Sequence, residues 1–251
     1  MKDTTRNTYL AVDFGGGSGR VIAGSLLQGK LELEEIHRFT NRQVKLGNHV
    51  YWDFPALFED MKTGLKLAAQ KGYHVKGIGI DTWGVDFGLI DKSGRLLENP
   101  VHYRDSRTAG TSDYSKRFID HNRLYEKTGI QIMEINTAFQ LLSIIRDRSE
   151  LLDRADKMLM MPDLFAYYLG AKPVAEMSIA STTQLFDANT KTWSEECCER
   201  LKIKHSLLPE IVAGGTVVGT LSDEICKELD IKPAKIIAAC GHDTQSAMVA
   251  V

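Results

Sequence analysis

Residues 9–20 read Tyr-Leu-Ala-Val-Asp-Phe-Gly-Gly-Gly-Ser-Gly-Arg, an apolar run that carries Asp13 and passes directly into a glycine-rich turn. In a dinucleotide-binding fold such glycines would open a helix, and in a P-loop they would lead to Gly-Lys-Ser/Thr. Neither pattern follows here. Residues 21–27 and 31–39 instead have the patterns of strands, and a turn at residues 28–30 separates them. The stretch therefore predicts an antiparallel meander of strand, glycine loop, strand, turn and strand.

After the meander, the spacing of the apolar residues changes from that of strands to that of a helix, and this change indicates the fold class. Residues 54–70 place their apolar side chains on one helical face, with Pro55 suited to the first turn and Gly72 to the C-terminal end. Residues 75–81 then form a short buried strand pattern, which should return parallel to the first strand by the right-handed crossover rule. These elements predict an α/β fold, a ribonuclease-H-like (actin/hexokinase-type) domain with a mixed sheet flanked by helices. Further expected elements are strands at 85–90 and 235–240, helices at 139–148, 164–169, 194–201, 222–229 and 244–251, and a turn at 188–193.

The composition excludes several classes of protein. The chain has 251 residues, 31 Lys and Arg against 33 Asp and Glu, a formal net charge of −2 and 43% apolar residues. So small a net charge provides no long-range field for nucleic acid or an anionic membrane. The polar first residues do not resemble an export signal, and no apolar run reaches the roughly 18 residues that span a bilayer. Neither the four cysteines nor the seven histidines have metal-ligand spacing. We expect a cytoplasmic chain with reduced thiols that binds neither nucleic acid nor membrane.

Asp13 and the glycine loop form the first candidate site. Successive glycines permit unusual backbone angles that can direct N–H groups toward phosphate oxygens. Ser18 adds a hydroxyl donor and Arg20 a permanent positive charge, while Asp13 could hold Mg²⁺ directly or through water. The alternative is a tight hairpin in which Asp13 bonds the turn.

Two further stretches carry groups that could bind a polyol. Residues 78–86 place two carboxylates, Trp83 and Gly84 just beyond a strand, where ligand sites gather in α/β folds. Trp83 offers an apolar wall, and Gly84 lets a ligand approach the backbone; alternatively, the acids cap helices and Trp83 fills the core. Residues 102–108 are dense in hydrogen-bonding groups, which suit either a polyol or a solvated loop with Asp–Arg pairing.

Asp243 lies between Gly241 and the last expected helix. In that position it can cap the helix N-terminus. It can also act as a general base that accepts the proton of a substrate hydroxyl during attack on a γ-phosphate, with His242 and Thr244 holding the substrate.

The order of these motifs resembles that of the FGGY carbohydrate kinases, and the resemblance covers essentially all 251 residues. It rests on residues 11–20, 78–86, 103–108, 161–163, 180–185 and 241–244. It implies that Gly16, Gly17, Ser18, Gly19 and Arg20 contact the phosphates of ATP and that Asp13 is associated with Mg²⁺. It also implies that Gly84, Tyr103, His242, Asp243 and Thr244 contact a ketose, with Asp243 as the catalytic base. The Gly-Gly-Gly-Ser loop departs from the Ala-Ser-Ser or similar loop common in this branch, which should loosen the loop slightly.

Members of this family resemble two lobes hinged about a cleft, with the sugar held mainly by the first and adenine by the second. Residues 1–251 are expected to be the N-terminal, sugar-binding and catalytic-base domain, with the C-terminal ATP-binding domain absent from this chain. Its last residues form an uncapped apolar turn. The implied reaction is ATP-dependent phosphorylation of L-rhamnulose to L-rhamnulose 1-phosphate, and the isolated lobe should be nearly inactive. The alternatives are a kinase for another ketose such as L-fuculose or L-xylulose, or a non-catalytic sugar- or nucleotide-binding module.

Overall fold

The antiparallel meander predicted from the sequence is present in the computed structural model, which describes residues 7–251. Strands β1 (Asn7–Phe14), β2 (Ser18–Leu27) and β3 (Lys30–Thr40) pair antiparallel in chain order. The register places Asp13 opposite Arg20. Because β2 begins at Ser18, the last residues of the glycine-rich stretch belong to a strand and only residues 15–17 form the turn.

The crossover that defines the fold class is also confirmed. Helix α1 (Phe54–Gln70) leads to β6 (His74–Thr82), which pairs parallel to β1. The sheet continues through β14 (Lys235–Ile237), parallel to β6, to β13 (Val217–Thr220), which is antiparallel at the edge. The resulting order, β13-β14-β6-β1-β2-β3, is a mixed sheet flanked by helices.

Helix α1 begins and ends where its sequence indicates. The side chain of Asp53 accepts a hydrogen bond from the backbone N–H of Ala56 at the N-terminus, and Pro55 occupies the first turn. Lys71 is the C-cap, and Gly72 follows it with a φ of +79°, a conformation that glycine adopts at little cost. The caps fix the length of the helix, and its apolar face packs against the sheet.

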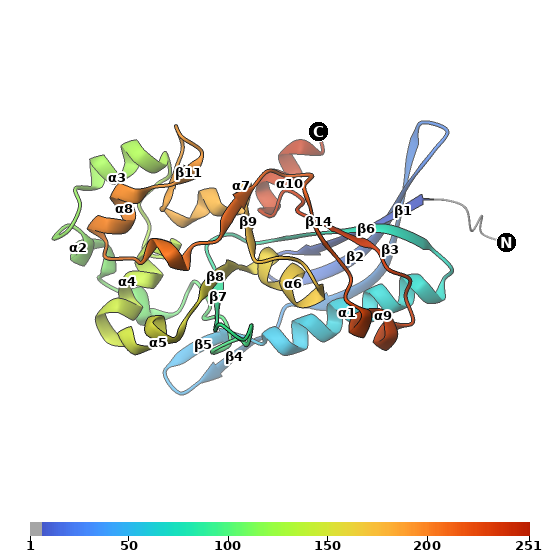
Figure 1. The fold of residues 1–251 in the computed structure, drawn as a ribbon, viewed down its shortest axis with the longest axis horizontal. Coiled ribbons are helices and arrows are strands. Elements are labelled where there is room, and N and C mark those ends of the chain that lie inside the picture. Colours follow the sequence, from blue (N-terminus) through green and yellow to red (C-terminus); the bar gives the residue numbers. More distant parts are fainter. Residues whose placement is uncertain (1–6) are drawn as a thin grey trace.

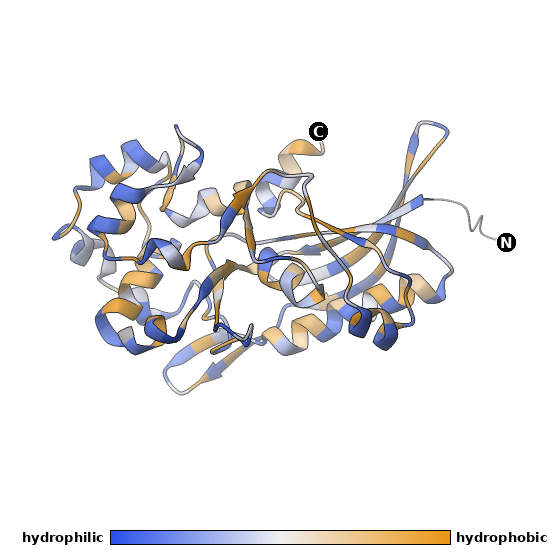
Figure 2. Cartoon of the chain, viewed as in Figure 1, coloured by the Kyte–Doolittle hydropathy of each residue, from blue (hydrophilic) through white to orange (hydrophobic). Residues whose placement is uncertain are grey.

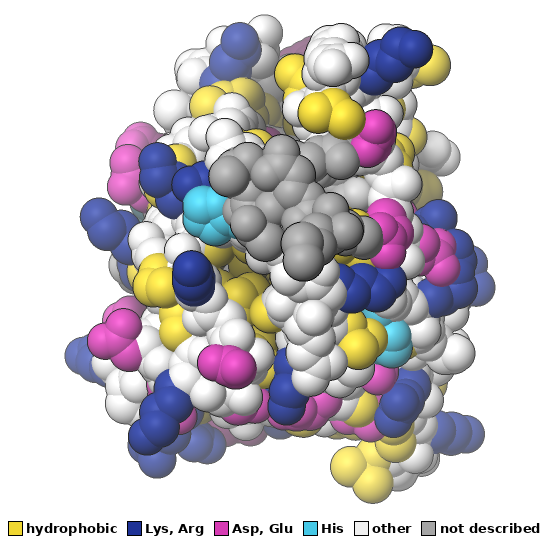
Figure 3. Space-filling view, turned by 90° about the vertical axis from the view of Figure 1, so that its right-hand side faces the viewer, with side chains coloured by type: hydrophobic (Ala, Val, Ile, Leu, Met, Phe, Trp, Pro, Cys, Tyr) yellow, Lys and Arg dark blue, Asp and Glu magenta, His cyan; other side chains and the backbone are white. Residues whose placement is uncertain are grey.

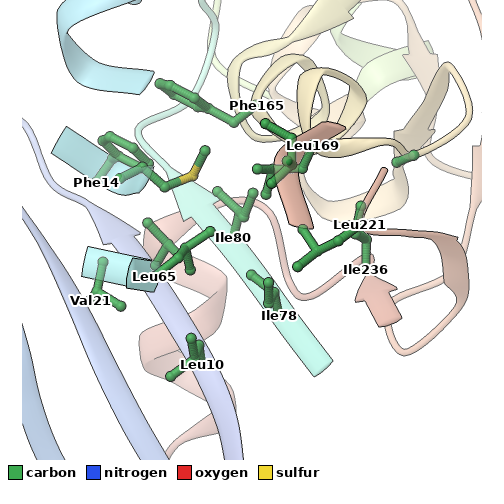
Figure 4. Close-up of a cluster of buried hydrophobic side chains, with 14 of the residues drawn as sticks. Leu10, Phe14, Val21, Leu65, Ile78, Ile80, Phe165, Leu169, Leu221 and Ile236 are labelled. Carbon is green, nitrogen blue, oxygen red and sulfur yellow. The ribbon is translucent and has the colours of Figure 1, made fainter. Parts of the chain in front are cut away.

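The first hydrophobic core lies between the sheet and three helices, namely α1, α6 (Met161–Leu169) and α9 (Asp223–Leu229) (Figure 4). Phe14 of β1 stacks on Phe165 of α6 with ring centroids 4.3 Å apart. Leu10, Ile78 and Ile236 come from three neighbouring strands and are at most 1% exposed. Figure 2 shows hydrophobic colour along these strands and helices, which is the pattern that the sequence periods predict.

A second hydrophobic core is formed by residues from the middle of the chain, at the left of Figure 1. The elements around and beside it are β7 (Phe87–Ile90), the 3₁₀ turn Ser106–Thr108, α2 (Thr111–Ser115), α3 (His121–Thr128), α4 (Thr137–Asp147), α5 (Ser149–Arg154), β8 (Lys157–Met160), β9 (Val174–Glu176), α7 (Met177–Ala180), the 3₁₀ turn Ser181–Thr183, β10 (Phe186–Asp187), β11 (Thr192–Trp193), α8 (Glu195–Arg200), the 3₁₀ turn His205–Leu207 and β12 (Glu210–Val212). The remaining elements are the hairpin of β4 (Gln43–Leu46) and β5 (His49–Trp52), and α10 (Asp243–Val249).

The helix boundaries differ from the prediction by up to three residues, and two strands and one hairpin differ more clearly. The strand expected to begin at Val85 begins at Phe87, because Val85 has a φ of +69°, which is incompatible with a strand. The strand expected to run to Cys240 ends at Ile237. The hairpin of β4 and β5 was missed, because its strands are only four residues long and β4 is exposed throughout. The turn expected at 188–193 covers the connection from β10 to β11, but its last two residues, 192 and 193, form β11.

The two faces of the large sheet differ in character. Figure 1 shows α10 on the opposite side of the sheet from α1 and α9. Tyr9 is 52% exposed, and Leu31 and Leu33 are each 66% exposed.

Figure 3 shows one end of the molecule, where Lys and Arg side chains are interspersed with Asp and Glu, as the near-zero net charge predicts. Within residues 7–251, no helix is long and apolar enough to cross a membrane.

Candidate active site

A row of charged side chains crosses three neighbouring strands of the sheet. Arg20 of β2 is the register partner of Asp13 of β1, which is in turn the partner of Asp81 of β6. Arg20 Nε lies 3.0 Å from Asp13 Oδ2, yet it finds no partner with hydrogen-bond geometry among residues 7–251. The contact is therefore an ion pair rather than a directed hydrogen bond.

Asp81 is the carboxyl group in this row with the most perturbed acidity. Burial and, to a lesser extent, the negative charges of Asp13 and Asp243 together raise the pKa of Asp81 to about 7. Two segments that are far apart in the sequence meet here, because the N–H of Thr82 at the end of β6 donates a hydrogen bond to the carbonyl of Gly241, 2.9 Å long, two residues before Asp243. Three of the carboxylates noted in the sequence thus share one region.

The carboxylates of Asp13 and Asp81 would fit a Mg²⁺ ion that takes its other ligands from water and from a bound group. Among residues 7–251, no group of three or more His, Cys, Asp or Glu side chains could hold a metal ion alone. Mg²⁺ typically uses only one or two carboxylates, together with water and substrate phosphates. Asp13 and Asp81 lie on adjacent strands, whose spacing is about 4.8 Å. A cation between them would offset the repulsion that raises the pKa of Asp81.

The raised pKa of Asp81 predicts that stability depends on pH. In the unfolded chain this group loses its proton near about pH 4, whereas in the folded chain it holds the proton up to about pH 7. The folded state therefore binds more protons in this window, so the free energy of unfolding should fall as pH rises from about 4 to about 7. Urea unfolding of the wild type and of Asp81→Asn across this window measures the effect. The variant should show a shallower fall, and equal slopes would contradict the assignment.

The glycine turn differs from its expected conformation. The φ angles of Gly15, Gly16, Gly17 and Gly19 lie outside the left-handed region, so the prediction of unusual backbone angles was wrong. Gly19 has a packing reason, since a Cβ there would lie 2.3 Å from the ring of Phe39. The turn is closed by a hydrogen bond from the N–H of Gly15 to the carbonyl of Ser18, 3.0 Å long, and Gly16 and Gly17 are exposed. Their small size leaves the turn open to a ligand.

Asp86 organises an aromatic cluster below the end of β6. This fully buried carboxylate accepts hydrogen bonds from Nε1 of Trp52 at 2.7 Å and of Trp83 at 2.9 Å. It also accepts bonds from the N–H of Tyr103 and from Nε2 of Gln140. Burial raises the pKa of Asp86 to about 6. The carboxylate thus binds side chains of the core rather than capping a helix.

The Trp83 side chain fulfils both roles that the sequence left open. It is 6% exposed and packs against Trp52 with ring centroids 3.9 Å apart and ring planes tilted by 30°, so it belongs to the core. It also lines a pocket of about 380 Å³. The lining residues are Trp83, Gly84, Val85, Tyr103, Ile130, Gln131, Met133, Ile135, Asn136, Thr182 and His242.

The pocket brings together three of the residues predicted to contact a ketose: Gly84, Tyr103 and His242. A Cβ on Gly84 would lie 3.1 Å from Thr182 Cγ2 and 3.3 Å from His242 Nε2, so a larger residue would crowd both side chains. Asp243 and Thr244 are not among the lining residues and directly follow His242 at the start of α10. The pocket and the candidate base are therefore adjacent.

Asp243 is not the N-cap of α10. His242 occupies the N-cap position, and Asp243 is the first residue of the helix. Asp243 Oδ1 accepts hydrogen bonds from the N–H of Thr244 at 2.6 Å and from its hydroxyl at 3.1 Å, and it lies 3.6 Å from His242 Nε2. The Asp243 side chain is 35% exposed, so it is accessible to a substrate. Burial lowers the pKa of His242, which favours the neutral imidazole.

Glu176 holds the loop that carries these residues, and sequence reasoning missed it. Its Oε2 accepts hydrogen bonds from the N–H of Gly241 at 2.9 Å and from those of Ser178 and Ile179 at the start of α7. The hydroxyl of Ser178 accepts a bond from the N–H of His242 at 3.2 Å. Asp163 lies behind Glu176, and burial raises its pKa well above the ordinary value. These contacts fix the loop before Asp243.

The loop of residues 102–108 is mainly structural. Asp105 accepts hydrogen bonds from the N–H groups of Val50 and Arg107, and it contacts Nδ1 of His49 at 3.0 Å. Of the two alternatives that the sequence left open for this loop, the solvated Asp–Arg pairing does not describe Arg107, whose guanidinium donates to Oε1 of Gln140 at 2.7 Å. Tyr103 is the member of this loop that lines the pocket.

The match to known proteins spans this fold and this site. Residues 8–250 match the model of the N-terminal domain of the FGGY family of carbohydrate kinases. The chain belongs to this family, which confirms the resemblance and the fold class predicted from the sequence.

Among individual proteins, the chain is 43% identical over 246 residues to a rhamnulokinase from Bacteroides thetaiotaomicron, covering 98% of this chain and 51% of that protein. It is 41% identical over 242 residues to a rhamnulokinase from Oceanobacillus iheyensis, covering 96% and 51%. Its structure is similar to that of gluconate kinase from Lactobacillus acidophilus, with a TM-score of 0.85, 20% identity, and coverage of 95% and 48%. The chain spans about half the length of the curated relatives it matches.

Proposed function

We propose that this chain is the N-terminal lobe of an ATP-dependent ketose kinase that converts L-rhamnulose to L-rhamnulose 1-phosphate. The observation that carries the proposal is the accessible carboxylate of Asp243 beside the pocket that His242 and Gly84 line. The two rhamnulokinases support the choice of L-rhamnulose.

In this mechanism, the pocket holds the ketose with its terminal hydroxyl toward Asp243. The hydroxyl oxygen forms a bond to the γ-phosphorus of ATP, the bond from that phosphorus to the ADP oxygen breaks, and Asp243 accepts the hydroxyl proton. Neutral His242 orients a sugar hydroxyl through its ring nitrogens. Residues 16–20 contact the phosphates, with Asp13 and Asp81 beside them. Mg²⁺, when bound, offsets the charge on the phosphates.

We further propose that this chain supplies the N-terminal lobe and that a second, C-terminal lobe binds the adenine side of ATP. The coverage of about half of each relative supports this division. Phosphate transfer needs the γ-phosphate held in line with the attacking oxygen. In this proposal, the N-terminal lobe holds the sugar, and the second lobe is needed to hold ATP in that position. The 251-residue chain alone should therefore bind the ketose and show negligible turnover.

A coupled assay that follows ADP formation tests the proposal on the 251-residue chain and on a two-lobed protein that contains it. The two-lobed protein should phosphorylate L-rhamnulose with a higher kcat/KM than L-fuculose or L-xylulose. A preference for another ketose would reject the proposed substrate, and strong turnover by the 251-residue chain would reject the proposed division. Sugar binding without turnover by the two-lobed protein would favour a non-catalytic binding module.

A further inference from the structure

We propose that three apolar side chains of the pocket recognise the methyl group of the ketose, at the end away from the phosphorylated hydroxyl. Ile130, Met133 and Ile135 are the specificity-determining residues that contact this methyl group. The inference rests on the proposed function, because Asp243 defines the reacting end of the sugar. It assigns to the substrate a chemical feature, a 6-deoxy carbon, that these side chains recognise.

Much of the lining of the pocket is apolar. Five of its lining side chains are apolar, namely Trp83, Val85, Ile130, Met133 and Ile135. A ketohexose carries oxygen on every carbon, and each hydroxyl buried without a hydrogen-bond partner costs about 1–3 kcal/mol. A pocket with this lining therefore suits a ligand with one apolar end.

Two of the polar side chains in the lining already have protein partners. Thr182 Oγ1 accepts a hydrogen bond from the N–H of Val85 at 3.1 Å and donates to the carbonyl of Ile179 at 2.8 Å. Asn136 Nδ2 donates to the carbonyl of Gln131 and to Oε1 of Gln184. Because of these bonds, Thr182 and Asn136 have less capacity to form hydrogen bonds with sugar hydroxyls. The ring of His242, next to Asp243, is therefore the more important polar contact for the sugar.

Ile130, Met133 and Ile135 form an apolar wall of the pocket, and they come from a different part of the fold than His242 does. Residues 130–135 form the connection between α3 and α4, and Ile132 within it packs against the second core. Met133 stays 40% exposed although it is apolar, and it lines the pocket. An exposed apolar side chain facing a pocket gains free energy when a ligand covers it with carbon rather than with a hydroxyl. The proposal places the reacting end of the sugar at Asp243 and its opposite terminus against this wall.

A matched pair of sugars isolates this contact. L-Rhamnulose is 6-deoxy-L-fructose, so L-fructose differs from it only by a hydroxyl on the terminal carbon. The two-lobed protein should prefer L-rhamnulose by about 10- to 100-fold, both in kcat/KM and in Kd measured by calorimetry, because an apolar wall discriminates against an added hydroxyl to that extent. Met133→Gln places an amide on the wall and should reduce the preference about tenfold.

The matched control is Leu46→Gln, which introduces the same side chain at an apolar position of the β4–β5 hairpin that is 70% exposed and outside the pocket. It should leave the preference unchanged. Equal Kd values of the wild type for the two sugars would overturn the inference, and so would an unchanged preference in Met133→Gln. Binding preference without turnover of either sugar would reject the proposed function and keep the inference. Failure of both sugars to bind would reject both.

Discussion

Replacing Asp243 by asparagine is expected to lower kcat for ketose phosphorylation by about 10²- to 10⁴-fold, the contribution typical of a general base. The amide keeps an oxygen that can accept the hydrogen bonds from Thr244, so the start of α10 should remain intact. It cannot accept the proton of the sugar hydroxyl. The change therefore removes the chemistry and preserves the geometry.

Steady-state kinetics on the two-lobed protein and calorimetry with L-rhamnulose measure the two effects separately. The Kd of the sugar should stay close to that of the wild type while kcat falls. Asp91→Asn, in the exposed turn before Arg95, is the matched control and should keep the kcat of the wild type. A near-normal kcat in Asp243→Asn would show that another group accepts the proton.

The second large effect is structural. Asp86→Ala should lower the free energy of unfolding by about 3–5 kcal/mol, because each buried donor left without a partner costs about 1–3 kcal/mol. The donors concerned include the indole N–H groups of Trp52 and Trp83 and the backbone N–H of Tyr103. Since Trp83 and Tyr103 line the pocket, the affinity for the ketose should fall as well.

Chemical denaturation and sugar titration measure these two consequences. Asp86→Asn is the conservative comparison, because its amide oxygen still accepts hydrogen bonds at the same place. It should retain more stability than Asp86→Ala. An Asp86→Ala protein as stable as the wild type would show that the aromatic cluster holds itself together without the carboxylate.

The framework of the fold could be predicted because local patterns determine it. Alternation in residues 9–39, the helical period of 54–70 and the buried run at 75–81 predict three strands, a crossover helix and a parallel strand. Crossover handedness then places the ends of β1 and β6 side by side, which explains why Asp13 and Asp81 meet. Each step uses only neighbouring residues and one general rule.

The parts that could not be predicted depend on contacts between distant segments. Glu176 meets Gly241 across 65 positions, and residues near it have no pattern that indicates such a contact. The wall of residues 130–135 has no regular period, so the sequence did not indicate that it lines the pocket. The φ of +69° at Val85 is likewise set by its surroundings, because a β-branched residue disfavours that conformation. The resemblance located Gly84 and His242 in one site where spacing alone could not.

Phosphorus NMR of the product most directly tests the central claim, that this lobe presents a ketose hydroxyl to Asp243 for phosphorylation. The two-lobed protein is incubated with ATP, Mg²⁺ and L-rhamnulose, and the phosphorus signals are followed together with ADP formation. The account predicts equal amounts of ADP and a sugar phosphate whose phosphorus couples to the protons of the C1 methylene group. ADP without a sugar phosphate, or a phosphate on any other carbon, would contradict it.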